Sequence, residues 1–163
     1  MACDRTQLVN ILRQCGTPTP GFTPVIYYVP MSDFLTPVTL DTDGNVTAFN
    51  LATTGHFQKL EISARKNALK ANGKDGGYFE PSIEVLHPKI NSVSSKALQA
   101  MQNLLFAVVI VDNTGNSLIA QNLEFMYDAT LDDSSNDYKI TFKSGPATQP
   151  FLFIKSGTTI PLP

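Results

Sequence analysis

The sequence predicts a mainly β fold: an antiparallel β-sandwich or barrel with one flanking α-helix and a short N-terminal helix. Roughly nine short segments have the β-branched, aromatic or alternating residues that are typical of strands. Most of these segments are joined by short polar connections, which favour antiparallel hairpins over parallel β-α-β units. One longer segment has helical periodicity. The 163 residues are enough for one hydrophobic core, so a single domain is expected.

The first 22 residues are expected to form a separable helical arm and linker, and residues 23–163 the single β-rich domain. Asp4 can cap a short helix that runs to Gln14, because the apolar side chains that follow it recur at roughly helical spacing. These apolar residues are Leu8, Val9, Ile11 and Leu12. The glycines and prolines of residues 16–21 then stop the helix and form the linker.

The first half of the domain is predicted to consist of strands and hairpins. The predicted strands cover residues 24–30, 38–40, 46–51, 57–64 and 78–85. The second and third of them are joined by the turn Asp41–Asn45. The last two are expected to pair with each other as a hairpin with a long tip. Pro81 cannot donate a hydrogen bond to a sheet, so it predicts an edge strand or a bulge.

The tip of that last hairpin, residues 65–77, is basic and glycine-rich and is expected to be exposed and mobile. The residues that we expect to make its contacts are Arg65, Lys66, Lys70, Lys74 and Gly76. We interpret it as an inter-subunit loop rather than a nucleic-acid-binding finger, because it lacks interleaved aromatic residues and the chain has a net charge of −2. Its complement on a neighbouring subunit would be an acidic turn. The residues of that turn are Asp132, Asp133 and Asp137.

The second half of the domain is predicted to begin with its only long helix. Ser94 or Ser95 can cap this helix, which is expected to end at Leu105 and to bury Met101 and Leu105 against the sheet. The turn Asp112–Asn116 is expected to join the first two strands after the helix. The strands predicted after the helix cover residues 106–111, 117–121, 123–127, 138–142 and 151–154.

No catalytic residue, metal ligand or cofactor site is predicted. His56 and His87 lie at facing ends of the predicted long hairpin and can approach each other, but two histidines without a third ligand make a poor metal site. The segment Asp41–Asn45 resembles part of a calcium loop but lacks the Glu that ends such a loop, so a hairpin turn is the better interpretation. The carboxylates of residues 128–137 are interpreted as a solvated turn, with a weak cation site as the alternative. The cysteines, Cys3 and Cys15, are expected to be free thiols.

Composition and charge exclude several classes of protein. Charged residues make up only 16% of the chain and are not strongly basic, so tight binding of DNA or RNA is not expected. The longest apolar stretch, Leu104–Val111, is far shorter than the roughly 20 residues of a membrane-spanning helix. The N-terminal residues lack the pattern of a secretory signal, which predicts folding in a cytoplasm. A surface this poor in charge favours self-association.

The segment Leu104–Asn116 leads from the end of a helix into a buried strand and an Asp-Asn-Thr-Gly-Asn turn. It resembles the tail-tube proteins of tailed phages and the related tube subunits of contractile injection systems, and the order of elements extends the resemblance over residues 23–160. The resemblance implies hexameric rings that stack into a hollow tube with DNA as a non-specific passing cargo. It also implies that sheets of neighbouring subunits join edge to edge and that long loops reach the next ring. The protein would then belong to the virion, assemble in the host cytoplasm and contact other virion proteins, but no membrane.

Other functions fit the same composition. A head-to-tail connector or a capsid-decorating virion protein is one alternative, and a monomeric ligand-binding or glycan-binding β module is another. A hydrolase without a recognisable motif is a more distant one. The oligomeric form separates them, because a tube protein forms rings or polymers, a decorating protein is often a monomer or trimer, and a binding module is a monomer with a deep pocket.

Overall fold

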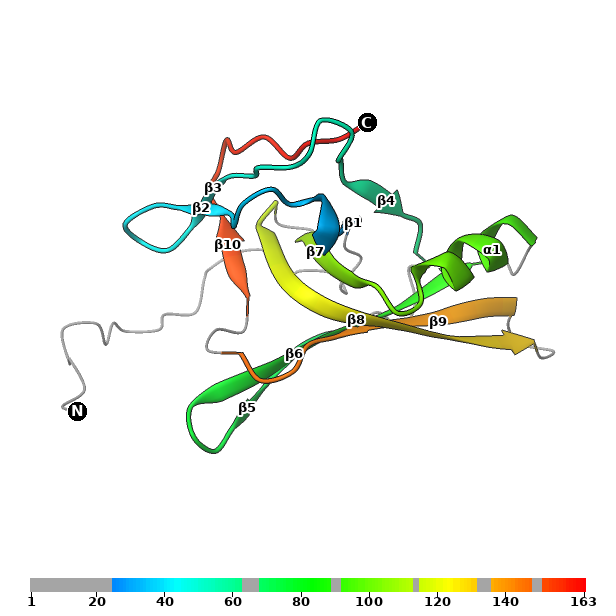
Figure 1. Cartoon of the computed structure of the whole chain (residues 1–163). Helices are drawn as coiled ribbons and strands as arrows, with labels where there is room; N and C mark the ends of the chain where they lie inside the picture. Colours follow the sequence, from blue (N-terminus) through cyan, green and yellow to red (C-terminus); the bar gives the residue numbers. More distant parts are fainter. Residues whose placement is uncertain (1–24, 63–67, 89–91, 113–114, 132–135, 148–150) are drawn as a thin grey trace.

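Ten strands, one α-helix and one short 3-10 helix make up the described part of the chain (Figure 1). This computed structural model describes residues 25–62, 68–88, 92–112, 115–131, 136–147 and 151–163. The strands are β1 (Val25–Pro30), β2 (Thr39–Leu40), β3 (Val46–Ala48), β4 (Gln58–Leu60), β5 (Ala68–Lys74), β6 (Tyr78–Pro88), β7 (Leu105–Val111), β8 (Ser117–Leu131), β9 (Asn136–Lys143) and β10 (Leu152–Ile154). The helices are η2 (Met31–Asp33) and α1 (Ser92–Met101). The predicted mainly β fold with one flanking helix is confirmed, while the predicted N-terminal helix and linker lie outside the described residues.

The strands form one strongly bent sheet that folds over into two layers. The path across the sheet is β2-β3-β10-β8-β7-β1-β4, and from β8 a branch continues through β9 and β6 to β5. Paired strands are antiparallel, apart from a short parallel contact between β10 and β3. In Figure 1, β1, β7 and β10 lie in the upper layer, and β5, β6 and β9 in the lower layer. The described sheet does not close on itself, so the sandwich rather than the barrel is observed.

The long strand β8 belongs to both layers. Its first half pairs with β7, and its second half, from Glu124 onward, pairs with β9. Between the halves, Gln121 and Asn122 lie opposite the single residue Ala107 of β7, which is a β-bulge. Asn122 has a φ of 56°, a left-handed conformation that Asn adopts more readily than most side chains. Because a bulge bends a strand and increases its twist, β8 can pass from the upper layer into the lower one at this point.

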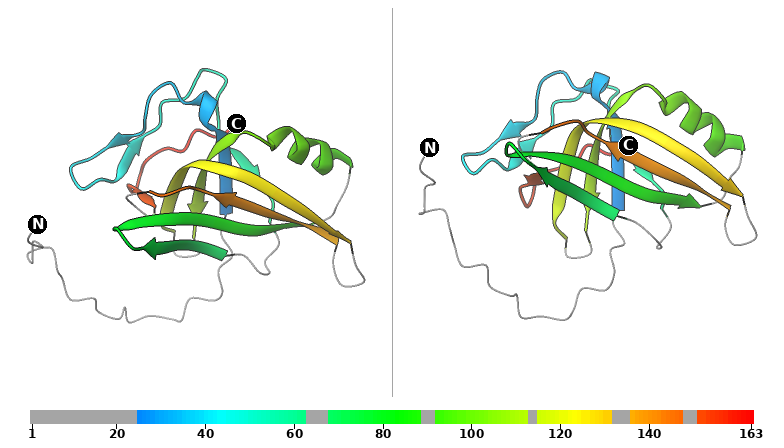
Figure 2. Two further views of the ribbon diagram at one scale, coloured as in Figure 1. Left: turned by 60° about the horizontal axis from the view of Figure 1, so that its bottom comes forward. Right: turned by 90° about the horizontal axis from the view of Figure 1, so that it is seen from below.

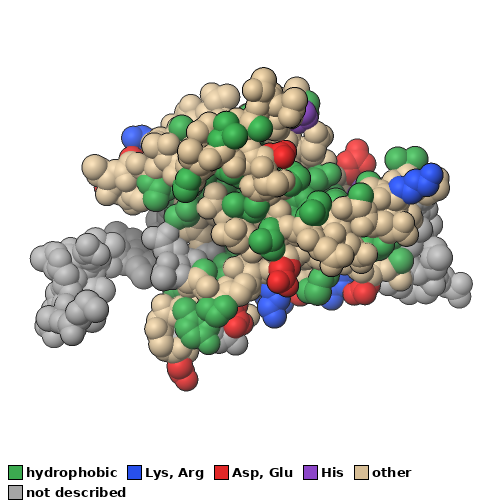
Figure 3. All heavy atoms as spheres, in the orientation of Figure 1, with side chains coloured by type: hydrophobic (Ala, Val, Ile, Leu, Met, Phe, Trp, Pro, Cys, Tyr) green, Lys and Arg blue, Asp and Glu red, His purple; other side chains and the backbone are tan. Residues whose placement is uncertain are grey.

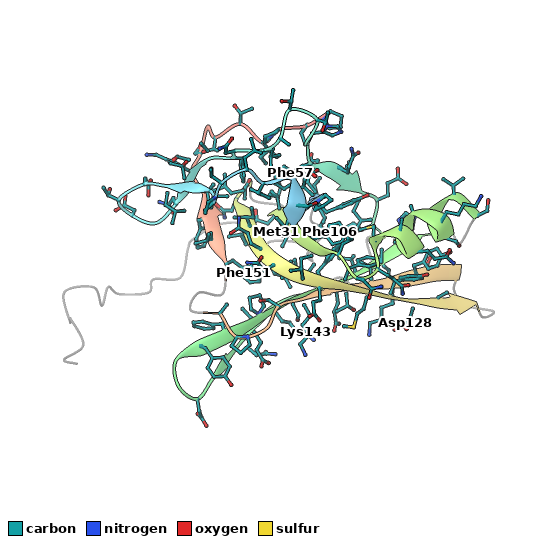
Figure 4. All side chains as sticks on the ribbon, in the orientation of Figure 1. Met31, Phe57, Phe106, Asp128, Lys143 and Phe151 are labelled. Carbon is teal, nitrogen blue, oxygen red and sulfur yellow. The ribbon has the colours of Figure 1, made fainter. Side chains whose placement is uncertain are left out.

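The main hydrophobic core fills the space between the two layers. Phe106 of β7 is fully buried there, and its ring lies 5.8 Å from that of Tyr28, 6.0 Å from that of Phe125 and 6.1 Å from that of Phe142, measured between centroids. These rings come from both layers and meet edge to face or tilted, an arrangement that aromatic pairs prefer. Figure 4 shows Phe106 between the layers, and α1 covers one side of the same core. The inward residues of α1 are Leu98 and Met101.

A second, smaller core lies on the other face of the upper layer. Phe57 is fully buried at its centre, with the rings of Phe34 and Phe49 at centroid distances of 6.4 and 5.4 Å. The C-terminal segment contributes to its cover, because the Phe57 N–H donates to the carbonyl of Pro161 at 2.8 Å. Strand β7 is therefore buried on both faces, which explains why residues 106–110 are all apolar.

The helix α1 ends earlier than predicted. Its last residue is Met101, whereas the sequence predicted an end at Leu105. Asn103 has a φ of 66°, so the chain turns away from the helix there and Leu105 becomes the first residue of β7. Met101 is buried as expected, but Leu105 is 46% exposed, so the expected burial of Leu105 is wrong.

The hairpin partner of β6 also differs from the prediction. Residues 57–64 were expected to pair with it, but β4 within that range pairs with β1 instead. Residues 68–74, expected to be part of a mobile tip, form strand β5 and pair with β6 along their whole length. The tip is therefore reduced to the three residues between these strands, Asp75–Gly77. A strand was missed here because its lysines and glycine are poor strand formers that only the pairing with β6 holds in place.

Pro81 lies in an interior strand rather than at the predicted edge, because β6 is paired on both sides. Its carbonyl accepts a hydrogen bond from the N–H of Ser144 at 3.0 Å, just past the end of β9 at Lys143. In an antiparallel strand the nitrogen and the carbonyl of one residue face the same side, so the Pro81 nitrogen faces the place where β9 has ended. The missing N–H therefore removes no hydrogen bond from the regular ladder.

Two hairpin turns share an Asp-x-x-Gly-Asn sequence and the same hydrogen bonds. Asp41 Oδ1 accepts the N–H of Asn45 at 2.9 Å, and Asp112 Oδ1 accepts the N–H of Asn116 at 2.9 Å. The glycines of the two turns have φ values of 81° and 88°. The hydrogen bond from Asn45, and another from the N–H of Asp43, lower the pKa of Asp41 below its ordinary value. The interpretation of Asp41–Asn45 as a turn is confirmed, because Asp41 Oδ1 accepts two backbone N–H groups of the turn and the Gly44 N–H donates to the Asp41 carbonyl.

Candidate assembly surfaces

In the part of the chain that the structure describes, the lower layer is a four-stranded sheet, in the order β5-β6-β9-β8, with an unpaired margin on each side (Figure 2). On one side, β5 pairs only with β6 among the described residues. On the other side, the pairing of β8 with β7 stops at Glu124, so residues 125–131 are paired with β9 alone within the described chain. This free part of β8 matches β5, which has seven residues, in length. Unpaired backbone N–H and C=O groups at a sheet edge are a template for pairing with another chain.

The outer face of the lower layer carries charges of both signs. Lys143 of β9 lies directly opposite Glu124 of β8, and Lys139 lies opposite Asp128. Opposite charges at facing positions stabilise paired strands. Figure 3 shows charged side chains of both signs along the lower side of the molecule, and Figure 4 shows Lys143 and Asp128 pointing away from the core. This face is polar but has no excess of lysine that would hold phosphate groups.

The residues predicted to make inter-subunit contacts lie at different places in this layer. Lys70 and Lys74 belong to strand β5 instead of a loop, and Gly76 lies at the hairpin tip with a φ of 93°. Asp137 belongs to β9, and the register places it about 20 Å along the sheet from Lys70. Among the described candidates, Lys70 and Asp137 of one subunit therefore do not lie together. Outside the described residues lie Arg65, Lys66, Asp132 and Asp133.

His87 connects three elements at the side of the sandwich that α1 covers. Its Nδ1 lies 2.7 Å from the carbonyl oxygen of Glu61, just after β4, and its Nε2 lies 3.1 Å from the hydroxyl of Ser94 in α1. Because a carbonyl only accepts hydrogen bonds, Nδ1 carries a proton and donates to Glu61, while Nε2 and the Ser94 hydroxyl share the second hydrogen bond. The ring also stacks on Tyr138, whose hydroxyl is hydrogen-bonded to Ser95. We interpret this group as the polar anchor that fixes α1 to β4, β6 and β9.

The two histidines do not form a pair of ligands in this arrangement. His56 precedes β4, whereas His87 contacts the backbone that follows β4, so the two residues lie toward opposite ends of that strand. Within the described residues, no group of three or more His, Cys, Asp or Glu side chains is placed to hold a metal ion. The anchoring role of His87 was missed by sequence reasoning, because its partners come from segments that are distant in the chain.

The free margin of β8 was also missed, although the sequence contains a signal for the bulge next to it. Ala120 and Leu123 both face the main core, and a regular strand cannot place residues three apart on one face. The alternation of inward-facing and outward-facing side chains therefore shifts by one residue, and the shift occurs at Asn122, a residue type that suits a bulge. With this signal, residues 117–131 can be recognised as one bent strand rather than two.

No protein-family model, curated protein or solved structure matches the chain. In the part of the chain that the structure describes, no helix is both long enough and apolar enough to cross a membrane. A functional assignment therefore depends on the geometry of the two margins and of the outer face between them.

Proposed function

We propose that the protein assembles through its lower layer into closed rings that stack as the tail tube of a virion, with DNA passing through the lumen. One observation carries this proposal: among the described residues, a single four-stranded layer has two unpaired margins of matching length, on opposite sides. Two different margins on one subunit favour a head-to-tail contact, which closes into a ring when the rotation between copies allows it.

The strand directions are compatible with such a ring. Three antiparallel pairings separate β5 from β8, so these two strands run in opposite directions. Rotation about a ring axis keeps the direction of every strand relative to that axis. The β8 margin of one copy would therefore meet the β5 margin of the next copy in antiparallel orientation, and the alternation would continue around the ring. Antiparallel pairing is the slightly more stable of the two kinds.

The outer face of the layer suits a lumen filled with water and DNA. Two of its lysines lie opposite carboxylates, Lys143 opposite Glu124 and Lys139 opposite Asp128, so along β8 and β9 it offers no basic track to the phosphates. The net charge of −2 for the whole chain also disfavours attraction to the DNA phosphates. Weak attraction lets DNA pass, whereas a strongly basic lumen would hold it through many phosphate contacts. Each proposed ring has six subunits, a number taken from the resemblance to tail-tube proteins.

The first experiment measures the assembly state of the purified full-length chain. Analytical ultracentrifugation over a range of concentrations, with negative-stain electron microscopy of the same samples, is expected to detect rings or hollow tubes. A monomer at all concentrations, with no recruitment by other virion proteins, would contradict the proposal. A monomer or trimer that binds only to capsids would instead identify a decorating protein, and a monomer that binds glycans would identify a binding module.

The second experiment tests the two margins by cross-linking. In a background with Cys3 and Cys15 replaced by serine, Asn72→Cys on β5 is combined with Asp128→Cys on β8, and in a second variant with Met126→Cys. Within one subunit, three strand spacings of about 4.8 Å separate these positions, which is too far for a disulfide. Neighbouring strands of two subunits lie within disulfide reach, so oxidation is expected to give a ladder of covalent oligomers.

The control for the margins places the second cysteine in the other layer. Leu40→Cys lies in β2 and is exposed, so it reacts with oxidants as readily as the margin positions but is not part of the proposed contact. The pair Asn72→Cys with Leu40→Cys is expected to stay monomeric on a denaturing gel. Equal ladders from the control and the margin pairs would show that the cross-links come from random collisions.

A further inference from the structure

Ser94, His87 and the carbonyl of Glu61 form a chain of hydrogen bonds at the start of α1. The His87 Nε2 lies 3.1 Å from the Ser94 hydroxyl oxygen, and the His87 Nδ1 lies 2.7 Å from the Glu61 carbonyl oxygen. A hydroxyl within hydrogen-bond reach of an imidazole, with a third group on the far side of the ring, is the arrangement in which a serine becomes a nucleophile. The polar anchor of α1 therefore has the geometry of an activated serine–histidine pair.

The Glu61 carbonyl determines which nitrogen of His87 can act as a base. A carbonyl oxygen has no proton to give, so Nδ1 carries the proton of this hydrogen bond. In the neutral ring the free lone pair is then on Nε2, the nitrogen that faces Ser94. The ring is also stacked on Tyr138, with the centroids 6.2 Å apart. His87 is therefore held in the tautomer and orientation that a general base needs.

Ser94 lies in the first turn of α1, a helix of 10 residues that begins at Ser92. The backbone N–H groups of a first helical turn have no carbonyl partner within the helix, and the helix dipole adds a positive potential there. Negative charge that develops on an acyl group attached to Ser94 would form close to this turn, which would stabilise it as an oxyanion hole does. Ser94 and His87 are both only half-buried, so neither is closed off from a small molecule in the solvent.

From this arrangement we propose that Ser94 is a nucleophile, activated by His87, that accepts the acyl group of a small ester. The Ser94 oxygen forms a bond to the carbonyl carbon, its proton moves to His87 Nε2, and the ester oxygen leaves as an alcohol with that proton. Water then attacks the acyl group, gives its proton to Nε2, and releases the acid as Ser94 regains a proton. The Glu61 carbonyl orients the ring but stabilises the imidazolium less than a carboxylate would, so turnover is expected to be slow. The proposal does not depend on ring assembly.

A fluorophosphonate probe tests the nucleophile in the full-length chain. The probe reacts with an activated serine by forming an oxygen–phosphorus bond with loss of fluoride, and mass spectrometry of the peptides locates the label. Ser94 is expected to be labelled at least about tenfold faster than Ser92, an exposed serine of the same helical turn, because general-base catalysis contributes about 10²–10⁴-fold. His87→Gln is expected to remove this difference while circular dichroism shows a retained fold. No labelling, equal labelling of both serines, or labelling of Ser94 that persists in His87→Gln would overturn the proposal.

A second measurement keeps His87 in place, so it does not depend on the stability of His87→Gln. Ser94→Cys and Ser92→Cys are each made in a background with Cys3 and Cys15 replaced by serine. Both thiols lie in the first turn of α1, so the helix dipole acts on both, whereas the contact with His87 belongs to position 94. Iodoacetamide is expected to alkylate the Ser94→Cys thiol at least about tenfold faster, because a neighbouring imidazole favours the reactive thiolate. Equal rates would overturn the proposal and leave His87 and Ser94 as a purely structural contact, whatever the outcome of the assembly experiments.

Discussion

A graded series of truncations along and after α1 tests the path of the chain at the helix end. Leu98→Ala, Leu105→Ala and Val93→Ala remove similar apolar groups from positions that are 4%, 46% and 77% exposed. Truncation of a buried leucine to alanine lowers the free energy of unfolding by about 2–5 kcal/mol, through lost transfer free energy and the cavity left behind. Leu98→Ala is therefore expected to lower the free energy of unfolding by about 3 kcal/mol.

The expected costs of the other two changes follow from their exposure. Full burial of a leucine side chain contributes about 1.5–3 kcal/mol to stability. Leu105 has about half of that burial, so Leu105→Ala is expected to lower the free energy of unfolding by about 1 kcal/mol. Val93→Ala is expected to be neutral or slightly stabilising, because the side chain is in water and alanine is the better helix former.

Urea titration of dilute, monomeric protein, followed by circular dichroism, measures the three free energies. In thermal melting, 1 kcal/mol corresponds to a shift of about 2–4 °C for a chain of this size. A cost for Leu105→Ala equal to that for Leu98→Ala would refute the reasoning. It would mean that the helix continues through Leu105, as the sequence pattern alone suggests, and that the chain does not turn at Asn103.

Three further predictions concern the turns and the bulge. Gly115→Ala is expected to cost about 1 kcal/mol, because it places a side chain at a φ of 88°, whereas Gly145→Ala, at a position without positive φ or close neighbours, is expected to be nearly neutral in urea titration. Asn122→Ala is expected to lower the unfolding midpoint for the same reason, and Asn122→Gly to retain it; equal losses from both would show that the bulge does not need a left-handed residue. The lowered pKa of Asp41 stabilises the fold above its ordinary value near 3.8, and this contribution is lost as the pH falls through the still lower value in the folded state. Wild type is therefore expected to be more stable than Asp41→Asn at pH 6, with a difference that shrinks toward pH 2, whereas a difference independent of pH would contradict the charge-based cause.

The parts of the fold that sequence reasoning predicted correctly depend on local patterns. The strand Val25–Pro30 and the turn Asp41–Asn45 were predicted because their signals lie within a few residues. The strand β5 and the end of α1 were not predicted, because both depend on distant partners. Residues 68–74 become a strand only through pairing with β6, and Leu105 leaves the helix only because β7 pairs from that residue onward.

For the candidate assembly surfaces, too, local patterns were readable in the sequence and long-range pairing was not. Self-association, expected from composition and low charge, stays a prediction; Lys70, which was assigned to the expected inter-subunit loop, lies in strand β5. The free margin of β8 could not be predicted without the bulge at Asn122, which separates the part of β8 that pairs with β7 from the part that does not. No local pattern reports which side of a strand remains unpaired, because that is a property of the whole sheet.

The strand β8 has a consequence for how the subunit loses its structure. Because one backbone pairs with β7 in one layer and with β9 in the other, neither layer can open fully without breaking hydrogen bonds of the same strand. The two layers are therefore expected to behave as one cooperative unit rather than as two separate foldons. Amide groups of β7 and of β9 would then exchange with deuterium at similar free energies. If the proposed assembly is correct, a subunit of this kind would enter a growing polymer either completely folded or not at all, and its edge strands would be protected from pairing with partly unfolded copies.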